Sequence, residues 1–196
     1  FNAAENISEE GTKQDSLEFS LMKARLEIYY ENIPANALRL FESKYTEDPN
    51  DANLYGLALA YKKNNNFDEG LASLDKLLEK YPKNLVLNTT KVEFLSYFNK
   101  FNDALDLANK FLEISPKNYP LSISKSQILL NMGQYFESEE IIRDQLLRKN
   151  DSPELWFMLS ETQKTSQNIV GYHQSRAEYF LLLGQDEKAL NQLEFA

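Results

Sequence analysis

The sequence contains no cysteine and a single histidine, and these two shortages remove several kinds of site at once. Without cysteine the chain forms no disulfide and has no thiol nucleophile or thiolate metal ligand. With His173 alone, it cannot supply the two histidines four residues apart that a helix-borne zinc site needs. We therefore predict no metal-binding residue and no catalytic residue in this chain.

Other absences narrow the class of partner. Lysine and arginine number 21 against 30 acidic residues, a net charge of −9, whereas nucleic acids and anionic membranes are bound by basic patches. No apolar run approaches the length of a transmembrane helix. The glycine-rich loops that bind nucleotides and the G-x-S-x-G turn of hydrolases are missing. We expect no cofactor, no nucleic-acid partner and no membrane insertion.

What the sequence does contain is a repeat with a period of 34 residues. Phe67 recurs as Phe101 and then as Tyr135, and Pro82 recurs as Pro116. A fixed period of this length is typical of a stacked array of helical pairs. The array, rather than any single motif, is therefore the main feature of the chain.

Residues 51–84 show the content of one repeat. Apolar side chains at i, i+3, i+4 and i+7 predict a first helix, a polar turn follows at 63–66, and a second apolar stripe predicts a helix that Pro82 ends. Each stripe is too wide for one partner helix, so pairs must stack on neighbouring pairs. The first stripe consists of Leu54, Leu57, Ala58 and Tyr61, and the second of Phe67, Leu71, Leu74, Leu77 and Leu78.

These residues resemble the tetratricopeptide repeat, whose signature positions are matched by Leu54, Leu57, Ala58, Tyr61, Gly70, Leu74 and Pro82. The resemblance implies an all-α, right-handed superhelical solenoid of helical hairpins over residues 17–196, with five to six pairs and about eleven or twelve helices. The expected helices span 17–31, 34–46, two each in 51–84 and 85–118, then 119–132, 135–148, 153–166, 170–183 and 186–195.

The two ends of the chain differ from the middle. Residues 1–16 are predicted to be a polar linker or leader, and since the chain starts at Phe1 without methionine we expect a piece of a longer protein. The first helix is more apolar than the end of a solenoid requires, because Phe19, Met22, Tyr29 and Tyr30 accompany its core stripe. Either its core face is broad, or this end docks on a domain outside the chain.

A narrower resemblance lies near the C-terminus. The segment Gly171–Phe180, followed by Gly184 and by Ala189–Leu193, resembles the C-terminal end of the periplasmic zinc metallopeptidases that enhance outer-membrane β-barrel assembly. In that family a HExxH zinc site occupies the N-terminal half, and the present chain has no HExxH. The resemblance implies a non-catalytic repeat domain in the periplasm, with zinc only in a separate peptidase domain. Its partners would then be that domain and the outer-membrane assembly machinery, in a chaperone-like role. The alternative is a free-standing scaffold, for which a cytoplasmic location stays open.

The residues of this motif are interpreted as structural: Gly171, His173, Arg176, Glu178 and Tyr179. Two other hypotheses stay open for His173. It could complete a metal site or contact in another domain, or it could form a hydrolytic site with Arg176 and Glu178.

Protein or peptide binding is the function that a helical solenoid favours, since its first helices line a concave surface. Applying the repeat register gives a candidate set for that surface: Phe19, Met22, Tyr29, Tyr55, Lys62, Lys63, Glu93, Tyr97, Gln127 and Asn131. Leu26 and Leu59 lie in the same register, but they are interpreted as packing residues.

Overall fold

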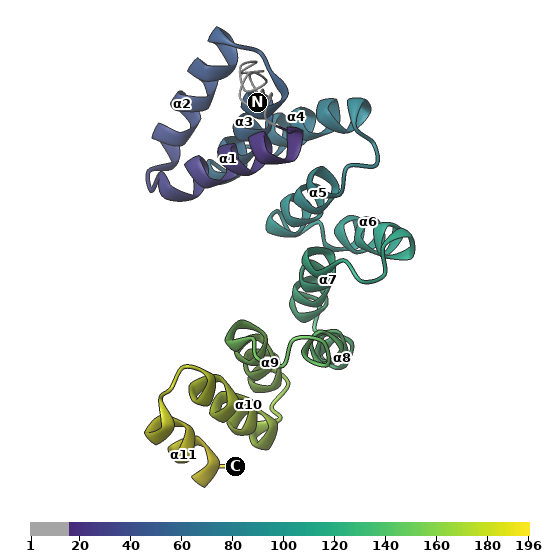
Figure 1. The fold of residues 1–196 in the computed structure, drawn as a ribbon. Helices are drawn as coiled ribbons and strands as arrows, with labels where there is room; N and C mark the ends of the chain where they lie inside the picture. Colours follow the sequence, from purple (N-terminus) through teal and green to yellow (C-terminus); the bar gives the residue numbers. More distant parts are fainter. Residues whose placement is uncertain (1–15) are drawn as a thin grey trace, which may run out of the picture. The chain divides into compact units, whose positions relative to one another are not determined.

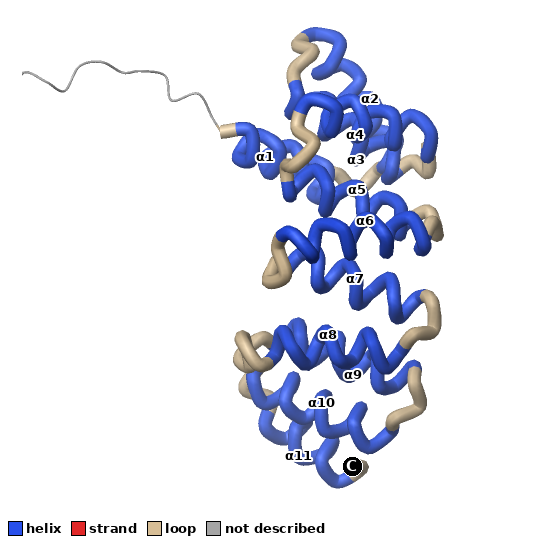
Figure 2. Tube along the Cα trace, turned by 90° about the vertical axis from the view of Figure 1, so that its right-hand side faces the viewer, coloured by secondary structure: helices blue, strands red, loops and turns tan. Residues whose placement is uncertain are grey.

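The computed structural model describes residues 16–196, so the predicted linker lies outside the described residues except for Ser16. The described part contains eleven α-helices and no strand (Figures 1 and 2). The all-α prediction is confirmed. The helices are α1 (Leu17–Tyr30), α2 (Pro34–Glu47), α3 (Asp51–Lys63), α4 (Phe67–Lys80), α5 (Leu85–Tyr97), α6 (Phe101–Ile114), α7 (Tyr119–Asn131), α8 (Tyr135–Leu146), α9 (Pro153–Thr165), α10 (Ile169–Leu182) and α11 (Asp186–Glu194).

The helices begin where side chains can cap them. Ser16 accepts a hydrogen bond from the backbone N–H of Phe19, and Asn50 accepts one from that of Asn53. Asn118, Ser152 and Asn168 cap α7, α9 and α10 in the same way. Such caps satisfy N–H groups that have no partner inside the helix. They explain why the predicted helix starts lie close to the observed ones.

Five of the connections share one turn. The loops 64–66, 98–100, 132–134, 166–168 and 183–185 each place their middle residue at positive φ: Asn65, Asn99, Gly133, Gln167 and Gly184. In each loop the next residue donates its N–H across the turn, for example Asn66 to the carbonyl of Tyr61 and Gln185 to that of Phe180, both at 2.9 Å. This is the Schellman ending of a helix. The connection from α10 to α11 therefore repeats the turn that joins α3 to α4.

The chain divides into two compact units, the first ending at Val86 and the second running from Leu87 to Ala196. The single continuous solenoid over 17–196 stays a prediction. In the first unit α1, α2 and α4 all pack on α3. In the second, each helix from α6 to α11 packs on the next. Both units are thus built by stacking of neighbouring helices, as the repeat requires.

Helix α3 is the centre of the first unit, since every residue from Leu54 to Ala60 is buried. Its start is tied to the end of α4, because Asp51 accepts hydrogen bonds from Lys80 at 2.6 Å and Tyr81 at 2.8 Å. Burial alone would raise the pKa of the Asp51 carboxyl, but these two donors and the Lys80 charge outweigh it and lower that pKa below its usual value.

In the second unit a core cluster joins α8 to α9. Ile142 and Leu146 from α8 pack with Leu155 and Leu159 from α9. Between α7 and α8 the contact is polar: Ser138 donates to the backbone carbonyl of Ser126 at 2.9 Å, and both side chains are buried. Small hydroxyl side chains let two helices approach closely while keeping their polar atoms paired.

Candidate protein-interaction surface

Helix α1 is apolar on two opposite sides, and within residues 16–196 only one of them is covered. Leu21, Ala24 and Ile28 are buried, and α1 packs on α3. On the opposite side, given 3.6 residues per turn, the outer face of α1 is formed by Phe19, Met22, Leu26 and Tyr29, and the exposed Ile33 follows beyond the end of the helix. A helix that is apolar all round is normally buried. The outer face is therefore the best candidate for an interaction surface.

The exposed fractions of these side chains are large. They are 58% for Phe19, 47% for Met22, 48% for Leu26, 72% for Tyr29 and 55% for Ile33. The four residues on α1 follow one another at spacings of three and four, which places them in one line along the helix. The interpretation of α1 as a broad core face is therefore wrong, and so is the interpretation of Leu26 as a packing residue. Leu59, at 7% exposed, is packed as predicted.

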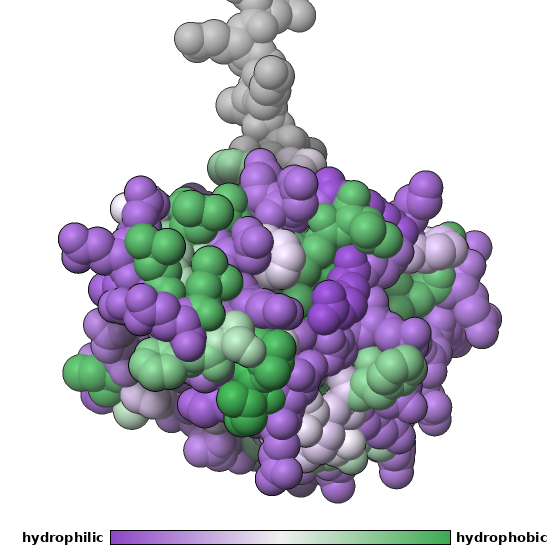
Figure 3. Space-filling model, turned by 90° about the horizontal axis from the view of Figure 1, so that it is seen from below, coloured by the Kyte–Doolittle hydropathy of each residue, from purple (hydrophilic) through white to green (hydrophobic). Residues whose placement is uncertain are grey.

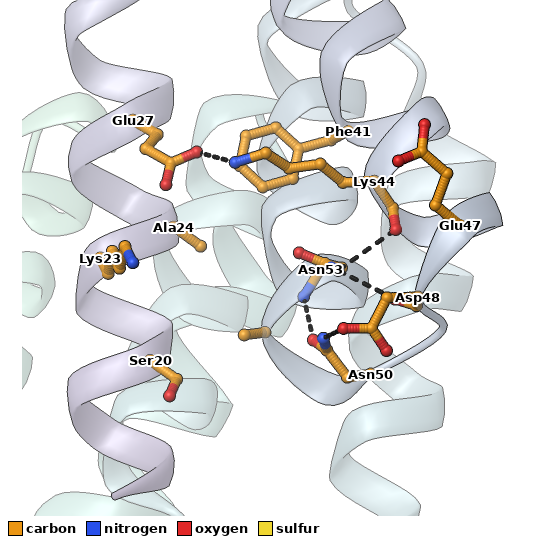
Figure 4. A pocket seen from close by; sticks show the side chains of 11 residues that line it. Ser20, Lys23, Ala24, Glu27, Phe41, Lys44, Glu47, Asp48, Asn50 and Asn53 are labelled. Carbon is orange, nitrogen blue, oxygen red and sulfur yellow. Dashed lines mark hydrogen bonds and ion pairs between the residues drawn. The ribbon is translucent and has the colours of Figure 1, made fainter. Parts of the chain in front are cut away.

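Between α1 and α2 lies a polar cavity of about 330 Å³ (Figure 4). The cavity is lined by polar side chains of α1 at the positions where α3, 34 residues later, has its apolar stripe: Ser20, Lys23 and Glu27 correspond to Leu54, Leu57 and Tyr61. A first helix usually packs on its own partner helix through that apolar stripe, and α1 lacks it. Phe41 and Ala24 also line the cavity.

The polar side chains of this cavity are largely engaged with one another. Glu27 forms an ion pair with Lys44, and Asp48 accepts a hydrogen bond from Asn50 at 2.6 Å. Asn53 donates to the backbone carbonyls of Lys44 and Asp48 (Figure 4). Within residues 16–196 no group of three or more histidine, cysteine or acidic side chains could hold a metal ion. The cavity is a mixed-charge cleft within the first unit.

The candidate residues on α3 do not form a surface. Tyr55 is fully buried, and its hydroxyl accepts a hydrogen bond from Nε of Arg25 at 2.9 Å. Its predicted exposure is wrong, because α3 is covered along its whole middle. Lys63 donates to the backbone carbonyls of Ile28 and Glu31 and so caps the end of α1, while Lys62 is half-buried.

The remaining candidates lie in the second unit. Tyr97 is 50% exposed, with its ring edge-on to Phe98 at a centroid distance of 5.1 Å. Glu93 is half-buried, whereas Gln127 and Asn131 are joined by a hydrogen bond of 3.3 Å at the surface. A single groove that combines these four residues with Phe19, Met22 and Tyr29 stays a prediction.

Comparison with known proteins identifies the fold. A family model of the tetratricopeptide repeat matches residues 31–88, which include α2, α3 and α4. The solved structure of a thermophilic TPR protein from Thermus thermophilus is similar over 90% of this chain and 96% of its own, with a TM-score of 0.68 at 18% identity. This is a tetratricopeptide-repeat fold.

Two further solved structures are similar over most of their length. One is PilW, described as a widely conserved type IV pilus biogenesis factor, with 17% identity, coverage of 90% of this chain and 91% of its own, and a TM-score of 0.66. The other is pilF of Pseudomonas aeruginosa, with 12% identity, coverage of 89% and 87%, and a TM-score of 0.63. At such identities the likeness shows the fold alone. No curated protein sequence matches the chain.

The C-terminal motif occupies the last helices of this tetratricopeptide fold. His173 Nδ1 lies 2.9 Å from the side-chain oxygen of Gln192, and its ring packs beside Phe195. This contact joins α10 to α11 and agrees with a structural role. Gly171 is buried, and a Cβ atom at this position would lie 2.8 Å from the side-chain nitrogen of Gln163. The side-chain oxygen of Gln163 accepts a hydrogen bond from the Ser175 hydroxyl at 2.7 Å.

Arg176 contacts aromatic rings. Its guanidinium carbon lies 5.0 Å from the ring centroids of Phe157, Tyr179 and Phe180. Nε and Nη1 are buried and have no hydrogen-bond partner within the described residues. Cation–π attraction offsets part of that desolvation. Glu178 is exposed. Tyr179 and Phe180 follow Arg176 on the same helix, whereas Phe157 is brought to it only by the pairing of α9 with α10, so this contact was not predicted.

Proposed function

We propose that this chain is a protein-interaction module that binds a partner through the outer face of α1. The observation that carries the proposal is the position of Phe19, Met22, Leu26 and Tyr29 on the side of α1 opposite its contact with α3. A contiguous exposed apolar patch on a folded domain marks an interaction site. Aromatic side chains and methionine are also enriched at the centres of protein interfaces.

The charge and the folded elements agree with this proposal. The net charge of −9 disfavours nucleic acid and anionic membranes as the partner. Within the described residues no helix is long and apolar enough to cross a bilayer. A protein surface with a complementary apolar face is the class of partner that fits.

The test is a capture experiment with the full chain. We expect immobilised wild-type protein to retain a partner from extracts of its own cells. The double variant Met22→Lys, Leu26→Lys should weaken that capture at least about tenfold, because burying two unpaired charges in the interface costs more than about 1.4 kcal/mol. Leu147→Lys is the matched control, because Leu147 is 87% exposed at the end of α8 and lies in the other unit. Equal capture by the double variant and the wild type would refute the proposal.

A finer candidate for the partner is the peptidase half of a zinc metallopeptidase. The motif Gly171–Phe180 supports it by resemblance, together with the apolar outer face that such a domain would cover. The chain would then be the non-catalytic repeat domain of a periplasmic enzyme in outer-membrane protein assembly and quality control. Mass spectrometry of the captured protein distinguishes the two candidates. A peptidase with a HExxH motif would support the peptidase-associated repeat domain, and any other protein would favour the free-standing scaffold.

A further inference from the structure

The end of the chain carries a second uncovered apolar face, on α11. Leu190 is 62% exposed, Leu193 55% and Phe195 68%, while only Ala189 of this helix is buried. Figure 3, a view from below, shows apolar side chains (green) at the surface among polar ones. We refer to Leu190, Leu193 and Phe195 as the end face of α11.

The repeat register shows what this face lacks. Leu193 is the eighth residue of α11; the eighth residue of α10 is Arg176, and the eighth residues of α2, α4, α6 and α8 are Phe41, Leu74, Ala108 and Ile142. Those four side chains are exposed by no more than 1%. Phe41 is covered by Gly56 of α3, and Ile142 by Leu155 and Leu159 of α9. In both of these cases the cover is the first helix of the next pair.

The outer face of α1 corresponds, in the same register, to the side of α3 that contacts the preceding pair of helices. Shifting by 34 residues places Phe19, Met22 and Tyr29 at Asn53, Gly56 and Lys63 of α3. These three α3 residues contact the preceding pair: Asn53 bonds to backbone carbonyls of α2 and its end, Gly56 lies against Phe41, and Lys63 bonds to the end of α1. The outer face of α1 is therefore the side on which a preceding second helix would pack.

We propose that the partner of this outer face is a second copy of the chain, whose α11 packs on α1 as α2 packs on α3. The inference rests on the proposed function and names the partner of the same surface. In the shared register Leu193 of one copy meets Met22 of the next, as Phe41 meets Gly56 within one chain. Because two different faces meet, the contact is heterologous and can extend from copy to copy.

Charge favours this arrangement over pairing of two α11 helices. In an antiparallel α11 pair, Asp186 and Glu187 of one copy would lie beside Glu194 of the other, and like charges repel. Against α1, the acidic α11 meets a stripe that is bordered by one exposed charge of each sign, Lys23 and Glu18. The occupant that fits the end face is thus the first helix of another copy.

Sedimentation equilibrium of the full chain tests this inference. We expect the average mass of the wild type to rise with concentration up to about 500 µM, since an interface of this small size is weak. Met22→Lys and Leu193→Lys should each be monomeric, because each destroys one of the two faces. Mixed in equal amounts, they should form a dimer and nothing larger, since one intact α11 face and one intact α1 face remain.

Two controls separate failure of this inference from failure of the proposed function. Leu147→Lys should associate like the wild type, and circular dichroism should show both face variants folded. Monomeric wild type at every concentration, association that survives Met22→Lys, or no dimer in the mixture would each overturn the inference. Suppose that one of these outcomes is observed, but the wild type captures a different protein and the Met22→Lys, Leu26→Lys double variant does not. The outer face of α1 then binds that other protein, and the proposed function stands.

Discussion

Replacing Gly56 with alanine is expected to lower the free energy of unfolding by about 3 kcal/mol. A Cβ atom at this position would lie 1.9 Å from Cε1 of Phe41 and 2.2 Å from its Cδ1. Phe41 is 1% exposed, so its ring has no free space into which to move. In the middle of a helix, glycine-to-alanine substitution normally stabilises by about 1 kcal/mol, so the expected effect has the opposite sign to helix propensity.

Chemical denaturation followed by circular dichroism measures this effect. Phe41→Leu is the informative second substitution, because a smaller side chain makes room for the new methyl group. We expect Gly56→Ala to cost much less in the Phe41→Leu background than in the wild type, a coupling that marks direct contact. Equal costs in the two backgrounds would show that α2 and α3 do not meet at these residues.

Replacing Tyr55 with alanine is expected to cost about 4 kcal/mol, in the range for deleting a fully buried aromatic ring. Tyr55→Phe should cost only about 1 kcal/mol, because it removes the hydrogen bond from Arg25 and leaves the ring in place. Tyr97→Ala is the matched control: half of that side chain is exposed, and we expect a change of about 0.5 kcal/mol or less.

Urea titrations of the three variants compare these costs directly. If Tyr55→Ala proved as mild as Tyr97→Ala, the ring would lie on the surface, as the repeat register alone suggested. The stability ranking therefore distinguishes a core position from a groove position without knowledge of any ligand.

The helices could be predicted from the sequence because several local signals agree. Pro82 and Pro116 end helices, Asn50 and Ser152 begin them, and the 34-residue period repeats the pattern. Such signals depend on the backbone and on the nearest turn of the chain. They need no knowledge of which faces meet.

Burial of individual faces was harder to predict. The register assigned Tyr55 to an open groove, yet the uncharged run from Leu54 to Ala60 was a usable sign of a helix buried on every side. In α1, apolar side chains on a second side of the helix are misleading as a sign of burial, since Leu26 is half exposed in this chain. An apolar face indicates that something covers it, but not whether the cover belongs to the same chain.

The contacts that define the interaction surface depend on distant residues. Polar side chains at Ser20, Lys23 and Glu27 could be read as a departure from the repeat, but the cavity that they line also requires Lys44 and Asp48 of the second helix and its end. Likewise, no local pattern near Arg176 indicates that Phe157 will lie against it.

Photo-crosslinking in the cell tests whether protein covers the outer face of α1. A photoreactive amino acid at position 22 should give covalent products between this chain and a second polypeptide, whereas the same group at position 147 should give none. Products from position 147 alone, or none from position 22, would show that the outer face of α1 binds no protein.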